Sequence, residues 1–362
     1  MINDQNASVA RTTVRELPAY SSRRFFRVIS IGGMMLAWVI ISLLALTVGS
    51  VEIAFKTVWQ IITSHLPFVN LHGDWSPTTD MVITGIRLPR IFMVGAVGTA
   101  LGVAGATYQG LFRNPLADPY LIGVAQGAAL GAVIGFILPW TFGGGYIIPF
   151  LAFLGALAAV SVVYLVARVG RTLPMMTLIL AGVAIGSLLI SITAYLTMIS
   201  ADKVQGILSW LMGSFSVSNW DQFKLIAPLI AVGLAVIFLY ARQLNVMQLD
   251  EEQAQQLGVN VERTKIILLA SASLITAVAV CFVGTIGFVG IIVPHTVRLI
   301  WGPDHRLLLP LSAIGGAILL ILADTASRTL MAPSEIPVGV ITAFLGAPFF
   351  LFLLKQKQKS VF

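Results

Sequence analysis

The stretch GVAQGAALGAVIG, Gly123–Gly135, decides the fold class, because it is apolar apart from one glutamine and has a glycine at every fourth position. Glycines at this spacing lie on one face of a helix and let a neighbouring backbone come close, as in membrane helix bundles. The apolar run Ile91–Leu111 has a similar stripe. We expect both helices to pack inside one subunit rather than at a dimer seam, through Gly98, Gly102, Gly123, Gly127 and Gly131.

The whole chain has the composition of an integral membrane protein. Of its 362 residues, 57% are hydrophobic and only 10% are charged, whereas a soluble domain has about a quarter charged residues. The formal charge of +7 fits positive loops on one membrane face, so it gives no reason to expect nucleic acid as a partner. The single cysteine, Cys281, lies in an apolar run and forms no intrachain disulfide.

Apolar runs predict an all-α protein with ten transmembrane helices and with both termini in the cytoplasm. The run Ile266–Ile300 would be about 50 Å long as one helix, so we divide it at the turn Gly284–Gly287. The predicted regions are a cytoplasmic tail (1–27), the ten-span domain (28–354, with a cytoplasmic segment at 241–265) and a second tail (355–362). The other runs are Val28–Val48, Ile91–Leu111, Leu121–Leu138, Ile147–Ala167, Met175–Ile199, Leu225–Tyr240, Leu307–Ala323 and Val338–Leu354.

The positions of lysine and arginine support this topology, because sixteen fall on the inner side and six on the outer side. Three arginines oppose the general excess of positive charge on the inner side. Arg87 and Arg90, in the motif RLPR, and Arg328 all lie on the outer side, where we expect them to be exposed at a wet rim. The simplest alternative for these arginines is contact with lipid phosphates at helix ends.

The sequence contains no pattern for catalysis or for metal binding. It lacks the phosphate-binding pattern GxxxxGK[ST], and its four histidines are not clustered at ligand spacing. We therefore expect no catalytic residue, metal or cofactor on this chain. A secondary transporter or channel that works without an ATPase is the main alternative, but it would need coupling-ion ligands that the spans do not offer. A membrane-embedded enzyme would need a catalytic set.

The cytoplasmic segment NVMQLDEEQAQQLGVNVERTK, Asn245–Lys265, predicts a short helix. Asp250 can cap it, Glu251 and Glu252 occupy its first turn, and Gly258 can end it in a left-handed cap. A short helix held parallel to the membrane can transmit motion as a rigid body. An ordinary interfacial loop fits the residues equally well.

Two further stretches contain turn or entrance signals. The motif RNPLADPYLIG, Arg113–Gly123, has prolines that predict a tight connection between helices. The outer segment Ala201–Trp220 is apolar and bulky, with Trp210 and Met212, and we expect it near an entrance. His295, in the stretch Gly287–Pro310, is better explained as a structural histidine than as a metal ligand.

Taken together, the motifs closely resemble the membrane permeases of ABC importers for ferric siderophores, haem and cobalamin. The resemblance runs from about Val51 to Lys355 through RLPR, NPLADP, QLG, GFVG, VPH, DHR and EIPVG with LGAP, in order and with matching spacing. Each motif is weak alone, but the set is specific. The resemblance implies the type II ABC importer permease fold with ten spans in a bacterial cytoplasmic (inner) membrane.

The same resemblance implies the partners of this chain. A second copy would complete a homodimer, two ATPase subunits would hold ATP and Mg, and a periplasmic or lipoprotein binding protein would deliver an iron chelate or cobalamin. The path would run at the centre of the dimer, flanked chiefly by the fifth and tenth spans. The chain itself would not be an enzyme, and the lipid bilayer is its remaining partner.

The resemblance also implies roles for individual residues. Glu251, Glu252, Ala254 and Gly258 would form the coupling segment on the ATPase. Arg87, Arg90 and Arg328 would meet acidic residues of the binding protein. The side chains proposed along the translocation path are Ser187, Ser191, Tyr195, Met198, Trp210 and Met212.

Overall fold

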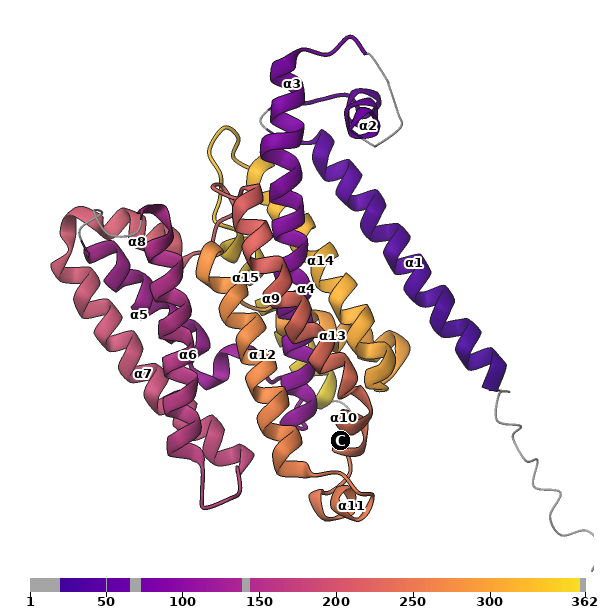
Figure 1. Ribbon diagram of the computed structural model, residues 1–362, viewed down its shortest axis with the longest axis vertical. Coiled ribbons are helices and arrows are strands. Elements are labelled where there is room, and N and C mark those ends of the chain that lie inside the picture. Colours follow the sequence, from indigo (N-terminus) through magenta and orange to yellow (C-terminus); the bar gives the residue numbers. More distant parts are fainter. Residues whose placement is uncertain (1–19, 50, 66–72, 139–143, 359–362) are drawn as a thin grey trace, which may run out of the picture.

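The computed structural model describes residues 20–49, 51–65, 73–138 and 144–358, and helices make up almost all of these ranges (Figure 1). The one exception to helix and loop there is an isolated bridge between Val169 and Thr172. The predicted all-α class is therefore confirmed for the described ranges.

Seven helical stretches in the described ranges are long and apolar enough to cross a membrane. They are α1 (Tyr20–Thr47), the continuous α3, η1 and α4 (Pro77–Met81, Val82–Arg87 and Leu88–Leu111), α6 (Ile147–Ala167), α7 (Met175–Ile199), α9 (Trp220–Leu239), α12 (Val261–Val283) and α14 (His305–Thr329). Three apolar helices are shorter, namely α5 (Val124–Ile137), α13 (Val289–Trp301) and the apolar part of α15 (Val338–Gln358). Each predicted span matches one of these helices, but ten crossings and cytoplasmic termini remain predictions.

Short helices connect the long ones. They are α2 (Phe55–Ser64), η2 (Pro119–Ile122), η3 (Gly144–Tyr146), η4 (Ala201–Lys203), α8 (Val204–Leu211), α10 (Ala241–Val246) and α11 (Glu251–Gln256). At the N-terminal side, α1 begins at Tyr20, inside the segment predicted as a tail. The predicted break at Gly284–Gly287 is confirmed, because α12 ends at Val283 and α13 begins at Val289.

Helix α4 lies at the centre of the bundle and packs against α14 almost backbone to backbone (Figure 1). A Cβ added to Gly98 would lie 2.3 Å from the carbonyl oxygen of Gly316, and one added to Gly102 would lie 2.3 Å from that of Ser312. Because neither position has room for a side chain, both glycines are required by packing within one subunit, as predicted.

A second seam joins α5 to α6. A Cβ on Gly127 would lie 2.3 Å from the carbonyl oxygen of Gly155, and one on Gly131 would lie 2.0 Å from that of Leu151. The packing role predicted for Gly123 is wrong. Gly123 has a φ of 83° and stands between η2 and α5, so it is needed for a left-handed turn, and a Cβ there would make only ordinary contacts.

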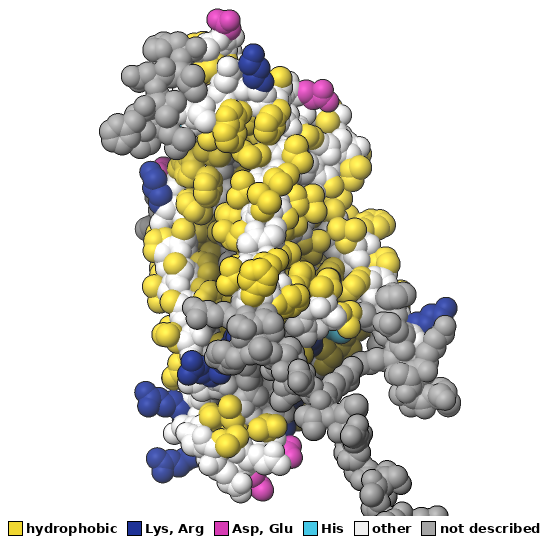
Figure 2. Space-filling view, turned by 90° about the vertical axis from the view of Figure 1, so that its right-hand side faces the viewer, with side chains coloured by type: hydrophobic (Ala, Val, Ile, Leu, Met, Phe, Trp, Pro, Cys, Tyr) yellow, Lys and Arg dark blue, Asp and Glu magenta, His cyan; other side chains and the backbone are white. Residues whose placement is uncertain are grey.

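Helices at the periphery of the bundle bury fewer of their residues than α4 at its centre. In the most apolar 18 residues of each helix, 83% are buried in the stretch with α4, but only 17% in α7 and 11% in α1. Figure 2 shows apolar side chains over the middle of one face, with charged side chains gathered at the two ends. This distribution fits a bundle surrounded by lipid.

Candidate functional site

The open face of α7 brings together four of the predicted path residues. Ser187, Ser191, Tyr195 and Met198 are all exposed, and their spacing places them along one side of the helix. Tyr195 is 64% exposed and Met198 is 79% exposed. The serine hydroxyls donate hydrogen bonds to carbonyl groups four residues earlier in the same helix, so they need no other hydrogen-bond acceptor.

Two cavities follow this helix on the side toward α5. One, of about 350 Å³, is lined by Ser187 and by Asp118 and residues of η2. The other, of about 500 Å³, includes Met198 and reaches α8. Both include Gln126 and Ile190, so the two cavities adjoin, and we call them together the groove along α7. Ser191 and Tyr195 do not line it. Its lining is largely apolar, with hydroxyl and amide groups and one carboxyl group.

The other two predicted path residues lie apart from that row, where three segments meet. Trp210 is partly buried in α8, and Met212, just after it, is 45% exposed. The amide of Gly339, at the start of α15, donates to the carbonyl of Met212 at 3.1 Å. The hydroxyl of Thr285 donates to the carbonyl of Leu211. This junction therefore joins α8 to the break after α12 and to α15.

At the N-terminal end of α4, four side chains form an outer cluster, defined here as Arg90, Asp324, Arg328 and Glu335. Arg90 donates to Asp324 at 2.8 Å and to both carboxylate oxygens of Glu335 at 2.8 and 2.9 Å. Arg328 pairs with Asp324 at 3.2 Å, and Ser216 donates to Glu335 at 2.6 Å. The cluster ties α4, α14, the loop before α15 and the segment after α8 together.

Glu335 is the most accessible member of the outer cluster, with its side chain 33% exposed. Burial alone would raise the pKa of Glu335, but hydrogen bonds from Arg90 and Ser216 outweigh it and hold the pKa below its usual 4.5. Glu335 is therefore a charged partner of Arg90 at neutral pH.

Arg87 and Arg328 both form hydrogen bonds at the end of α1. Arg87 donates to the carbonyls of Leu46, at 2.6 Å, and of Val51. Arg328 donates to the carbonyls of Ala45, at 3.3 Å, and of Val48. The last carbonyls of a helix lack partners within it and attract cations, so these two arginines cap the C-terminal end of α1.

The expectation that the three arginines stand exposed at a wet rim is therefore wrong. Arg87, Arg90 and Arg328 are only 6%, 7% and 7% exposed. The chain itself supplies the carboxylates and helix-end carbonyls that satisfy these cations. Docking of a binding protein at this end stays a prediction.

The segment predicted to couple to an ATPase forms α11, which lies beyond the lower end of α12 (Figure 1). Its end is the predicted left-handed cap, because Gly258 has a φ of 83° and the amide of Val259 bonds to the carbonyl of Ala254 at 3.1 Å. Its predicted start is wrong in one respect. Asp250 precedes the helix but its side chain makes no capping bond, and instead accepts from Arg113 at 3.3 Å.

Only part of α11 is available to a partner. Ala254 is fully buried against its own chain and so offers no surface to a partner, while its place in the coupling segment stays a prediction. Glu252 is exposed and Glu251 is partly exposed, and Leu257, at the end of the helix, is 63% exposed. A partner would therefore contact the face that Glu252 and Leu257 share with the neighbouring glutamines.

A residue that the sequence reasoning missed, Lys265, organises this end of the molecule. Its side chain is 3% exposed and bonds to Glu251 and to Glu262, each at 2.9 Å. It also donates to the carbonyl of Leu173 at 3.3 Å, while Glu262 accepts from the amide of Leu173 at 2.8 Å. Leu173 stands two residues before α7. We call Lys265, Glu251 and Glu262 the inner cluster, and it connects α11 directly to the start of α7.

Comparisons with known proteins agree with this architecture. Residues 36–356 match the model of the FecCD transport family. The chain is 48% identical to a cobalamin import system permease of Halobacterium salinarum, over 78% of this chain and 76% of that protein. It is 38% identical to a hemin transport system permease of Yersinia pestis, over 91% and 96%.

Two solved structures share the fold. An inward-facing structure of a putative metal-chelate type ABC transporter superimposes with a TM-score of 0.76 at 31% identity, covering 90% of this chain and 98% of that one. A Streptococcus pneumoniae complex, PsaBC with Fab, superimposes with a TM-score of 0.56 at 18% identity. The second likeness concerns the fold alone.

Proposed function

The chain belongs to the FecCD transport family, and we propose that it is the permease subunit of an ATP-driven ABC importer for an iron chelate or cobalamin. The observation that carries the proposal is the connection between two features. The uncovered face of α7 offers a largely uncharged groove, and the inner cluster joins the start of that helix to α11. Movement of α11 can therefore reach the groove.

We propose that a second copy covers the open faces of α7 and α15. Phe344 and Leu351 on α15 are 75% and 65% exposed, and large apolar side chains on both helices would line the space between two copies. The path would then be largely neutral, which suits a large chelate that must pass without tight binding. The ATP and Mg would belong to ATPase subunits docked on α11.

We propose docking of the binding protein at the end that contains the outer cluster. An acidic side chain of that protein would have to compete with Glu335 for Arg90, because Glu335 is the exposed partner of an otherwise buried cation. Docking of this kind would release Glu335 from Arg90 and would loosen the loop before α15. Charge pairs at such a site affect the association rate more than the affinity.

The relatives divide between substrates. One imports cobalamin and another transports hemin by name, and an Escherichia coli relative, 38% identical over 81% of this chain, serves Fe(3+) dicitrate. All three are metal chelates. We place cobalamin first, because the cobalamin permease is 48% identical to this chain over 283 aligned residues, and haem and ferric siderophores next.

Reconstitution tests this proposal. The chain, its cognate ATPase and its binding protein would be assembled in liposomes loaded with ATP, and uptake of labelled cobalamin, haem and a ferric siderophore would be measured. Uptake of one of them should need all three proteins and ATP. Ion-gradient-driven uptake by the chain alone would instead establish the secondary transporter as the correct reading.

A further inference from the structure

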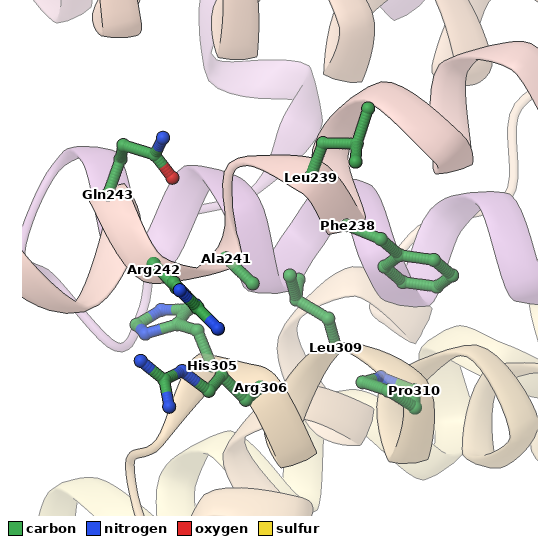
Figure 3. A pocket seen from close by; sticks show the side chains of 9 residues that line it. All are labelled: Phe238, Leu239, Ala241, Arg242, Gln243, His305, Arg306, Leu309 and Pro310. Atoms are coloured by element: carbon green, nitrogen blue, oxygen red, sulfur yellow. The ribbon is translucent and has the colours of Figure 1, made fainter.

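A cavity separate from the groove and from α11 lies between the end of α9, α10 and the start of α14. Its volume is about 520 Å³. Figure 3 shows that its lining is divided into two ends. The guanidinium groups of Arg242 and Arg306 lie at one end, and Phe238, Leu309 and Pro310 lie at the other.

The polar end contains two cations that are not neutralised by an ion pair. Arg242 and Arg306 are both exposed, and within the described ranges neither side chain forms an ion pair. Asp304 precedes α14, but its carboxylate is already occupied, since it pairs with Arg27 at 2.6 Å and accepts from Asn245 at 2.7 Å. Arg306 interacts with Asp304 only through its charge, so an anion in this cavity would meet two cations that form no ion pair among the described residues.

The same end holds a buried acceptor. His305 is 1% exposed and lines the cavity. Its Nδ1 donates to the side-chain oxygen of Asn245 at 2.9 Å, a tautomer required because that oxygen also accepts from the backbone amide of His305. Its Nε2 then accepts, and it has no hydrogen-bond partner among the residues the structure describes. This atom is shielded from solvent and faces Gly110 of α4, so the two arginines rather than the histidine decide the charge of the ligand.

We propose that this cavity binds an anionic phospholipid of the surrounding leaflet. The phosphodiester would lie between Arg242 and Arg306, and the acyl chains would follow Phe238 and Leu239 along α9. Helices α9 and α14 are both candidate membrane spans, so the apolar end lies toward the bilayer core and the arginines toward its surface. A soluble phosphate would use only the polar end, and basic pockets between membrane helices are known lipid sites.

Native mass spectrometry of the purified full-length chain tests the proposal. The chain would be offered phosphatidylglycerol and phosphatidylcholine with identical oleoyl chains. Wild type should retain phosphatidylglycerol preferentially. Arg242→Gln with Arg306→Gln should lower that preference about 25-fold, because each cation near the surface contributes about a factor of five. Lysine at both positions should restore part of it.

The matched control is Arg171→Gln with Arg263→Gln, which removes two other exposed arginines outside this cavity, and it should leave the preference unchanged. Melting curves would show that all variants fold. Equal retention of both lipids by wild type, or equal loss in the control, would overturn the proposal. Displacement of phosphatidylglycerol by millimolar glycerol 3-phosphate would show a site for soluble phosphates and would overturn the lipid assignment.

Discussion

The outer and inner clusters both pair buried cations with carboxylates, at opposite ends of the bundle, yet they differ in what they connect. In the outer cluster, Arg90 and Asp324 are 9% and 2% exposed and join α4 to α14, two helices that already pack backbone to backbone. In the inner cluster, Lys265 is as deeply buried, but its partners Glu251 and Glu262 are 43% and 27% exposed. They join short or terminal segments rather than a packed seam.

This difference shows that burial of the acid, rather than the presence of a charge pair, decides whether a pair must stay intact as a structural lock or can shift during movement. A buried carboxylate that loses its cation has no water to replace it, so Asp324 must keep its bonds to Arg90 and Arg328, whereas the more exposed Glu335 can separate. The acids of the inner cluster stay partly hydrated while they are bonded to Lys265. The inner cluster can therefore shift at low cost with α11 while Lys265 keeps its bonds.

The largest expected effect comes from breaking the outer cluster. Arg90→Ala would leave Asp324 buried with one cation fewer, and loss of one member of a buried pair costs about 3–5 kcal/mol. We expect a large fall in the melting temperature in detergent and in the folded yield. Glu335→Gln should cost far less, because that side chain is one-third exposed. Equal effects of the two variants would contradict the assignment of the outer cluster as a lock.

A smaller effect is expected at the end of α11. Gly258→Val forces a branched residue into a left-handed conformation and should cost about 1–2 kcal/mol, although a Cβ there meets nothing within 4 Å. Gly170→Val is the matched control, because Gly170 also has positive φ and open space but lies in the turn before α7. ATPase binding and uptake should fall only for Gly258→Val. Similar uptake by both variants would remove the special role of α11.

The smallest effect concerns acid pH at the outer cluster. Because its folded pKa lies below 4.5, Glu335 contributes stability that is present above pH 4.5 and is lost as the pH falls through the folded pKa. Hydrogen exchange of the loop before α15, corrected for intrinsic rates, should therefore lose protection below about pH 4.5. The Glu335→Gln variant should show no such loss of protection at any pH. A loss of protection of the same size in that variant would show that another group titrates.

Much of the fold is visible in the sequence, since apolar runs locate the long helices and glycine spacing locates the close seams. The site is visible only in part. Gly258 is predictable because a left-handed cap needs glycine, and the opposed bias of Arg90 marks it as unusual. Its partners Asp324 and Glu335, however, are 234 and 245 residues away, so only the fold reveals that the arginine is satisfied internally.

The inner cluster shows a second reason why the sequence alone does not predict the whole site. The spacing of Glu262 and Lys265 already suggests a pair within one helix, but the bonds to Leu173 join segments about 90 residues apart in the chain. The six residues of α11 are too few to show a period, so the burial of Ala254 could not be predicted from the pattern. Contacts between distant segments decide both features.

The central claim is that Lys265 transmits motion from α11 to α7, and the number of substrate molecules imported per ATP hydrolysed tests it most directly. The assembled importer in liposomes would be compared with Lys265→Met and with Arg263→Met, which removes an exposed arginine two residues earlier. We predict that Lys265→Met keeps ATP hydrolysis but loses most uptake, whereas Arg263→Met keeps both. Unchanged import per ATP in Lys265→Met would contradict the claim.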